Sequence, residues 1–461
     1  MKIMHHFVWA LTVGCFTSAS LFASPAAQSQ EDLRGEGRVT YYRVSSLETL
    51  DGEAVSSGVL MVRDGIIEKL GKAVSVPKGA RVRDFRRQGS VAMPPFVLAH
   101  ADFQVGKPKS SSNSSHYLAK DMIWLDQDWG TDLLEQGILM VGLNPQGSIL
   151  PGRTSVLRTD AGYPQPEAVY DDLHLVISLE SAGSRKTAIR QALADADAAI
   201  QKEKDAKIEW RKEREAWEKK QKEKEEAAKK EKEQKDSGGA EESAQSASEP
   251  KPEKASEEEA PPAEFEPPKL DQQVEAVVEW IRGQRIARVQ LASASSWLHW
   301  LELIGDREVA YELEFSRGWR GDSNLFKVLE GIAAAGVRVD LPATISFLPS
   351  SRNRLNLPAE AVAAGVEQLI LTPPSRVSNW RRDVAGLVAD GLDRNIALRA
   401  MTLEPASALG LETVIQPLKS GSPAHFVIWN GDPLDPQTEV LLVIADGEVV
   451  WDRAAEEEKK S

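Results

Sequence analysis

Seven short apolar runs alternate with helix-like stretches, and this pattern constrains the fold more than any other feature of the chain. The first run, FVLAH, begins at Phe96, and the last, VEQLILTPP, ends at Pro374. Most are rich in Val, Ile and Leu, which is typical of strands buried on both faces. The runs are residues 96–100, 137–145, 173–179, 287–293, 309–315, 337–343 and 366–374. This alternation predicts an α/β fold with a (β/α)8 TIM-like barrel over 94–404.

Both flanks of this region have the pattern of short β-strands with tight turns. On the N-terminal side, over 31–93, the dipeptide Asp64-Gly65 is a strong hairpin signal. On the C-terminal side, over 405–455, Asp446-Gly447 repeats that signal. We therefore expect the two segments to form one small β-sandwich domain beside the barrel.

A charged insertion at 199–268 interrupts the barrel. Glu and Lys dominate every face of 199–235, with Ile208, Trp210 and Trp217 as the few large apolar residues. A helix that is polar all round has no face to bury, so we expect it to project into solvent, stabilised by i,i+4 charge pairs. Residues 236–268 are rich in Ser, Glu, Ala and Pro and are predicted to be disordered. The insertion is either a docking arm or a tolerated surface extension.

The segment 1–27 has the pattern of a secretory signal peptide, an apolar stretch followed by small residues. It is too short and too rich in Ser and Thr for a membrane anchor. Cys15, the only cysteine, lies inside it, and Thr12 stands where a lipoprotein signal has Leu, which argues against lipidation. The cleaved chain has no cysteine and hence no disulfide, which favours export to a bacterial periplasm.

The first predicted barrel strand ends in two residues that can bind a metal. His100 and Asp102 are spaced i,i+2, so their side chains lie on the same face of an extended strand. Aspartate is a legitimate ligand of a divalent ion, although the pair alone would bind such an ion weakly.

Blocks at both ends of the chain carry a family resemblance: VRDGIIEKLGKAVSVPKGARVRDFRRQGSVAMPPFVLAH (62–100), IALRAMTLEPASALGL (396–411) and SGSPAHFVIWNGDPLD (420–435). These blocks resemble the amidohydrolase superfamily, in particular its imidazolonepropionase-like exported members. The middle of the chain is similar in strand order and in phrases such as LPAEAVAAGV. The resemblance implies a fold of metal-dependent hydrolases that act on carbon–nitrogen bonds other than peptide bonds.

The resemblance also implies a site at the carboxyl ends of the barrel strands. There, histidines of several strands hold one or two divalent metals, and an aspartate on the last strand accepts a proton from the metal-bound water. In this chain, His100 and Asp102 match the first pair of ligands. The other matched positions carry no residue of the expected kind: Ala292, Phe315, Ser316 and Pro373. The metal site is thus predicted to be degenerate.

Other titratable residues lie on the predicted strands. Glu312, Glu314 and Asp340 could include a carboxylate pair for glycoside hydrolysis, but we expect them to pack at strand ends or outside the barrel. We expect the remaining histidines of the exported chain to be ordinary surface or hydrogen-bonded core residues; they are His116, His174, His299 and His425.

These observations predict a catalytically inactive amidohydrolase-like protein. It would bind a small molecule at the barrel mouth, or pair with an active homologous subunit in a homo- or hetero-oligomer. No cofactor is expected, and zinc only if the residual pair is functional. Two alternatives stay open, which are an active hydrolase with a reduced single-metal site and an envelope scaffold that uses the charged arm. A net charge of −14 argues against nucleic acid, and we expect no membrane span after signal cleavage.

Overall fold

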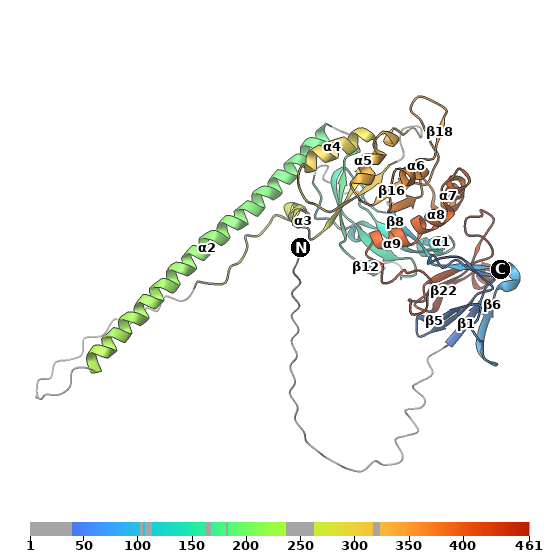
Figure 1. The fold of residues 1–461 in the computed structure, drawn as a ribbon, viewed down its shortest axis with the longest axis horizontal. Coiled ribbons are helices and arrows are strands. Elements are labelled where there is room, and N and C mark those ends of the chain that lie inside the picture. Colours follow the sequence, from blue (N-terminus) through green and yellow to red (C-terminus); the bar gives the residue numbers. More distant parts are fainter. Residues whose placement is uncertain are drawn as a thin grey trace, which may run out of the picture.

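The computed structural model describes residues 39–101, 105–106, 113–161, 167–180, 183–236, 262–316 and 323–460. The predicted signal peptide, Asp102 and residues 237–261 of the insertion lie outside these ranges. In the described part, no helix combines the length and the apolar character needed to cross a membrane. Figure 1 shows a barrel-like body with a β-domain beside it and one long helix that leaves the body.

Strands from both ends of the chain build the β-domain. One sheet has the order β5-β4-β1-β6, and the other has the order β22-β21-β20-β7-β2-β3. The first sheet consists of β1 (Val39–Arg43), β4 (Val59–Arg63), β5 (Ile66–Gly71) and β6 (Arg81–Asp84). The second consists of β2 (Ser46–Leu47), β3 (Val55–Ser56), β7 (Val91–Met93), β20 (Phe426–Trp429), β21 (Val440–Ala445) and β22 (Glu448–Asp452). Strand β20 pairs antiparallel with β7, so the two ends share one sheet.

The predicted hairpins of this domain are present. Asp64-Gly65 joins the antiparallel strands β4 and β5, and Asp446-Gly447 joins β21 and β22. All four turn residues have positive φ, which the tight two-residue turn requires and which Gly and Asp tolerate. Between the sheets, the rings of Tyr42 and Phe426 meet edge to face with centroids 5.2 Å apart. This contact joins the two ends of the chain in one apolar core.

The barrel-like body contains seven parallel strands in its described part, and they fall in two sheets. They are β8 (Phe96–Ala101), β9 (Ile138–Leu143), β13 (His174–Ser178), β14 (Ile286–Leu291), β15 (Tyr311–Phe315), β16 (Val339–Pro342) and β19 (Leu369–Thr372). Strands β8 and β9 pair in one sheet, and β13-β14-β15-β16-β19 follow one another in the other. Three antiparallel strands extend these sheets at β13 and β9: β10 (Ile149–Arg153), β11 (Ser155–Arg158) and β12 (Ala168–Tyr170).

The strands form no closed eight-stranded ladder within the described ranges, which differs from the predicted barrel. Strands β8 and β19 approach each other without pairing, and helix α9 (Leu403–Ala408) packs on both. Ala99, Ile370 and Ala408 form a small apolar cluster at this junction. Helix α9 thus covers the junction of the two unpaired strands, while the mixed α/β character is as predicted.

Helices with apolar inner faces cover the strands. They are α1 (Trp129–Leu134), α3 (Gln272–Ile281), α4 (Ala294–Ile304), α5 (Leu329–Ala334), α6 (Leu357–Ala363), α7 (Trp380–Ala389) and α8 (Arg394–Met401), with α10 (Arg453–Lys460) at the C-terminus. Helix α4 begins with a capping box between Ser293 and Ser296. Trp280 of α3 and Trp300 of α4 stack at 5.9 Å in the core, so the two helices are fixed relative to one another.

Helix α2 (Ser184–Asp236) contains the predicted charged helix but begins at Ser184, well before 199. Its first turns are amphipathic, with Ile189 and Leu193 buried against the body. Further along, the returning chain lies against the helix. The indole nitrogen of Trp210 donates to the carbonyl of Ala263 (2.8 Å), and the Trp210 ring packs on Phe265. Within the predicted disordered segment, residues 262–268 are thus an extended strap on α2.

Candidate functional site

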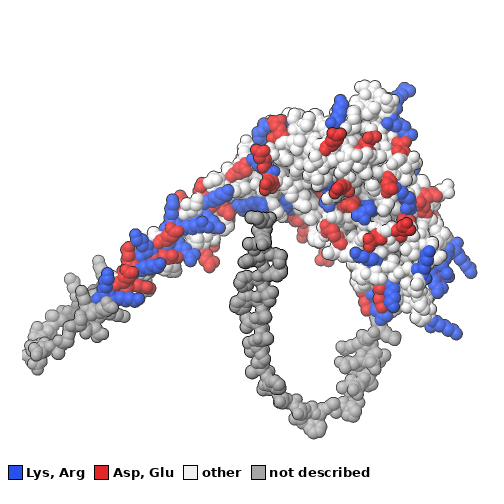
Figure 2. Space-filling view, in the orientation of Figure 1, with Lys and Arg blue, Asp and Glu red and all other residues white. Residues whose placement is uncertain are grey.

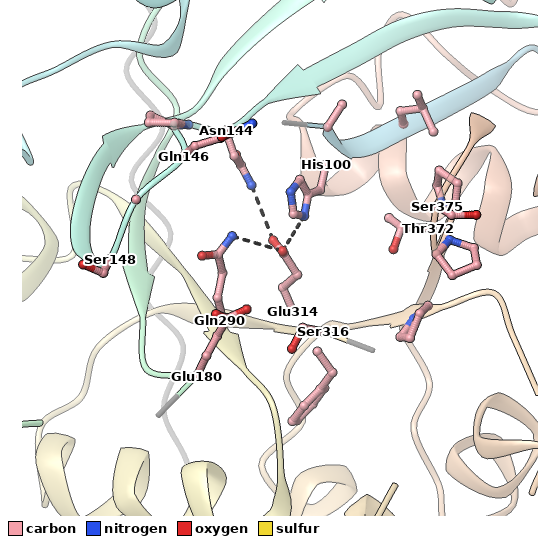
Figure 3. Close-up of a pocket in the computed structure, with 18 of the residues that line it drawn as sticks. His100, Asn144, Gln146, Ser148, Glu180, Gln290, Glu314, Ser316, Thr372 and Ser375 are labelled. Carbon is pink, nitrogen blue, oxygen red and sulfur yellow. Dashed lines mark hydrogen bonds and ion pairs between the residues drawn. The ribbon is translucent and has the colours of Figure 1, made fainter. Parts of the chain in front are cut away.

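A cavity of about 700 Å³ opens where the barrel strands end (Figure 3). Parallel strands direct their carboxyl ends to one face of a barrel, so residues far apart in sequence meet there. Five polar residues of its wall come from five different strands or the loops after them: His100, Asn144, Gln290, Glu314 and Thr372. The cavity therefore occupies the position at which barrels of this kind bind small molecules.

Glu314 is the centre of the polar contacts in this wall (Figure 3). Its Oε1 pairs with Nδ1 of His100 and accepts a hydrogen bond from Nε2 of Gln290 (3.1 Å). Its Oε2 accepts from Nδ2 of Asn144 (3.4 Å). The hydroxyl of Thr154 donates to Oδ1 of Asn144 (2.6 Å), which orients that amide toward the carboxylate. Both oxygens of Glu314 are thus engaged by protein side chains.

His100 and Glu314 favour each other's charged form. Burial alone would lower the pKa of His100, but the negative charge of Glu314 and the hydrogen bond to it raise that pKa above its usual value. Burial alone would raise the pKa of Glu314, but the charge of His100 leaves it lowered. The contact therefore favours the protonated imidazole and the ionised carboxylate.

Arg288 lies one layer below Glu314, two residues before Gln290 on β14. Its Nε and Nη2 atoms are each 2.6 Å from Oε1 of Glu312, the residue two before Glu314 on β15. Its Nη1 donates to the carbonyl of Ala99 (2.8 Å) on β8, which shares no sheet with β14. The side chain is 1% exposed and thus crosses the interior of the barrel.

Two further buried groups complete this lower layer. Oδ1 of Asp340 accepts from the hydroxyl of Thr372 (2.9 Å), and its Oδ2 lies 3.8 Å from Nη1 of Arg288. Burial raises the pKa of Asp340 to about 7, although Arg288 opposes the shift. His174 of β13 lies with Nδ1 3.7 Å from Oε1 of Glu312, and burial lowers its pKa to about 4. His174 is hence neutral at neutral pH.

The structure brings together most of the residues singled out in the sequence. His100, the penultimate residue of β8, lines the cavity. Phe315, Ser316 and Pro373 line it as well. Of the last three, only Ser316 has a polar side chain. Ala292 directly follows β14, and its N–H donates to the hydroxyl of Ser296 (3.1 Å), outside the cavity wall. Asp102 lies outside the described residues.

The prediction was wrong for two of the strand carboxylates, and one charged residue was missed. Glu312 and Asp340 are buried in the interior of the barrel-like body at 3% and 2% exposure. Glu314, at 7% exposure, is buried in the cavity wall near the carboxyl end of β15. Arg288 was not singled out at all. The sequence did contain a signal for this polar interior. Two predicted apolar strands each carry a pair of polar residues two positions apart, Arg288 and Gln290 on one and Glu312 and Glu314 on the other. Residues two apart share one face, so the pattern indicates a polar face directed at the axis.

His174 was predicted to be a surface or hydrogen-bonded core histidine, and it is a core residue. It is 1% exposed, and its Nδ1 faces Glu312 in the charged layer. It therefore belongs to the network of the barrel interior.

The side chains present do not fit a divalent metal centre. Among the described residues, no three His, Asp or Glu side chains are arranged to hold an ion. Nδ1 of His100 and the carboxylate of Glu314 are bound to each other. The guanidinium of Arg288, which stays protonated in proteins, lies 3.8 Å from both Glu314 and Asp340. A metal ion here would meet a fixed positive charge.

The solved structure of an amidohydrolase has this fold. An amidohydrolase from Thermotoga maritima matches with a TM-score of 0.60 and 18% identity, over 90% of this chain and 100% of that one. A β-aspartyl dipeptidase from Fervidobacterium islandicum matches with a TM-score of 0.49 and 12% identity, over 90% and 97% of the two chains. No protein-family model and no curated protein matches the sequence. The chain has the amidohydrolase fold, as its sequence blocks predicted.

Proposed function

We propose that this protein is a catalytically inactive relative of the metal-dependent amidohydrolases that binds a small polar molecule at the barrel mouth. The observation that carries the proposal is that protein side chains engage both carboxylate oxygens of Glu314. His100, Gln290 and Asn144 occupy its two oxygens, so the carboxylate is neither a free metal ligand nor a free general base.

The cavity supports the binding part of the proposal. Its volume of about 700 Å³ lies in the usual range for small-molecule sites, roughly 300–1,000 Å³. Around the Glu314 cluster, hydroxyl and amide side chains provide further donors and acceptors; they are Gln146, Ser148, Ser316, Thr372 and Ser375. Such a wall suits a ligand that carries several hydrogen-bonding groups rather than an apolar one.

Three further points belong to the proposal. The leader over 1–27 and the cysteine-free remainder support export to a periplasm. Among the described residues, no group of side chains fits a metal ion, which supports a protein that works without a bound cofactor. Pairing with an active homologous subunit is a compatible role, because an inactive barrel can still bind the partner's ligand.

Metal analysis combined with ligand screening tests this function. Purified wild type should contain no stoichiometric zinc and should hydrolyse no amide in a panel of N-acyl amino acids and dipeptides. Screening polar metabolites by thermal shift should find a compound that raises Tm. Ser375→Trp, which fills the cavity, should abolish that shift, while Ser420→Trp on an exposed loop of the β-domain should retain it.

The opposite result is equally well defined. Near-stoichiometric zinc, together with an amidase activity that a chelator removes and that His100→Ala abolishes, would establish the single-metal hydrolase instead. A compound that shifts Tm equally in both tryptophan variants would place binding outside the cavity.

A further inference from the structure

We propose that the molecule bound at the barrel mouth is a small hydroxy-carboxylate with a single negative charge, and that the guanidinium of Arg185 holds its carboxylate group beside the amide of Gln290. This inference rests on the proposed binding function and adds the chemical class of the ligand. It concerns the part of the cavity wall next to the Glu314 cluster.

The first step of the argument is that Arg185 places a permanent positive charge in the cavity wall. It is the second residue of α2, and it lines the cavity. Its Nη1 donates to the hydroxyl of Ser178 (3.0 Å), the last residue of β13, which anchors the guanidinium at the carboxyl end of that strand. Within the described residues this is the only hydrogen bond of the guanidinium, so most of its five N–H groups are left for a ligand.

The second step is the position of Arg185 relative to Gln290. Ser178 and Gln290 are direct neighbours on the parallel strands β13 and β14, which lie about 4.8 Å apart, so their side chains point to the same face. Gln290 is in turn the direct neighbour of Glu314 on β15. The guanidinium that is bound to Ser178 therefore lies about one strand away from the Gln290 amide, and both groups line the cavity.

The third step is that the Glu314 cluster offers donors rather than acceptors to the cavity. Protein side chains engage both oxygens of Glu314, and one of these bonds comes from Nε2 of Gln290 (3.1 Å; Figure 3). Among the contacts of the described residues, this leaves one N–H and the oxygen of the Gln290 amide for a ligand. A carboxylate accepts from this N–H and from Arg185, and a hydroxyl of the same molecule donates to the amide oxygen.

The first turn of α2 favours a negative charge at the same place. The N-terminal end of a helix carries partial positive charge, yet this turn contains Arg185 and Lys186 and no acidic residue. The stability of the helix therefore does not explain a cation at position 185. A bound anion compensates both the guanidinium and the helix end.

Glu180 limits the ligand to a single negative charge. Its Oε2 lies 3.6 Å from Nη1 of Arg185, and its exposed side chain lines the cavity. A phosphate monoester carries about two negative charges at neutral pH and would meet the carboxylates of Glu180 and Glu314 beside one guanidinium. A carboxylate has one charge and matches the planar fork of arginine.

Matched ligands and matched variants test the inference. Wild type is titrated calorimetrically with a panel of small hydroxy-carboxylates that includes glucuronate, gluconate and lactate, with the primary amide of each, and with glucose 6-phosphate. Arg185→Met removes the charge and Arg185→Lys keeps it. Arg190→Met is the control, because Arg190 lies on the same helix but pairs with Glu302 of α4 (3.2 Å), outside the cavity wall.

Wild type should bind at least one acid of the panel and prefer it over its amide by roughly 10- to 100-fold in Kd, the usual value of a hydrogen bond to a charged group. Arg185→Met should bind that acid and its amide with similar Kd. Arg190→Met should keep the wild-type preference, and Arg185→Lys should keep a smaller one. If Arg185→Met does not fold, the acid–amide comparison in wild type still decides between the outcomes.

The inference would be overturned if acid and amide bound wild type equally, if the preference survived in Arg185→Met, or if glucose 6-phosphate bound while no carboxylate did. A wild type that binds only neutral molecules at the mouth would defeat this inference and leave the proposed function intact. A wild type that binds no compound of either kind would defeat the proposed function, and this inference with it.

Discussion

The barrel interior and helix α2 both contain Arg–Glu pairs, but the pair in the interior is buried and the pair on α2 is exposed to solvent. In the interior, the side chains of Arg288 and Glu312 are 1% and 4% exposed. On α2, Arg214 and Glu218 form an i,i+4 pair at 3.2 Å with about half of each side chain exposed. Figure 2 shows that both signs of charge cover α2 along its described length. Although the distances are similar, breaking the two pairs should affect stability very differently, because water solvates the exposed pair and not the buried one.

The largest expected effect comes from breaking the interior pair. Glu312→Ala leaves Arg288 buried without its closest partner and should lower the free energy of unfolding by about 3–5 kcal/mol, measured by urea denaturation. Combining Arg288→Met with Glu312→Leu should recover much of the loss, because no uncompensated charge then remains at this pair. A loss below about 1 kcal/mol in Glu312→Ala would mean that the interior pair behaves like an exposed one.

A smaller effect should appear as pH dependence. The pKa of Asp340 is about 7 in the folded protein and about 3.9 in an unfolded chain. Since the folded state binds the extra proton between these values, Asp340 makes stability fall as pH rises from about 4 to 7. Asp340→Asn removes this fall. The free energy of unfolding of the variant minus that of wild type should therefore rise by on the order of 2 kcal/mol from pH 5 to pH 8.

The control for this pH experiment is Glu218→Gln on α2. It should leave the pH profile of unfolding parallel to that of wild type. Equal profiles for wild type and Asp340→Asn would show that Asp340 ionises in the folded protein as it does in water.

The strap on α2 should produce a local effect. Trp210→Ala removes the hydrogen bond to Ala263 and the ring contact with Phe265. Global stability should change by about 1 kcal/mol or less, but hydrogen exchange of 262–268 should accelerate strongly, since few other contacts hold this segment. Unchanged exchange over 262–268 in Trp210→Ala would mean that other contacts hold the strap in place.

The smallest effect is expected for the exposed pair. Arg214→Ala should change the free energy of unfolding by no more than about 0.5 kcal/mol, and the change should shrink further in high salt. Arginine 214 also stacks over the Trp210 ring, so the double variant with Trp210→Ala separates the stacking from the ion pair. If Arg214→Ala lowered the free energy of unfolding as much as Glu312→Ala does, the exposed pair would be as important for stability as the buried one.

Much of the architecture could be predicted from local sequence. The β-hairpins follow from Asp-Gly pairs between apolar strands, and the barrel strands follow from runs buried on both faces. Phe315, Ser316 and Pro373, which the resemblance singles out, all line the cavity. The start of α2 was predicted too late, because its first turns are amphipathic and only the charged part was recognised.

The charged interior could not be predicted with the same certainty. Arg288 and Glu312 are 24 residues apart, and Arg288 and Ala99 are 189 apart. Such contacts depend on strand order and stagger, which local propensities do not specify. When these long-range contacts are unknown, the partner of an acidic residue on a predicted strand is unknown too. Burying an unpaired carboxylate costs so much free energy that the sequence alone argues against it.

By itself, the sequence determined most of the strands, the tight turns and the charged arm. Strand alternation also divides each strand into two faces, but it does not say which face meets the axis. Only the tertiary structure decided that the polar faces of β14, β15 and β16 point inward and that Arg288 lies among their carboxylates. The physical reason is that a buried charge is tolerated only beside its partner, and the partner is supplied by the assembled barrel.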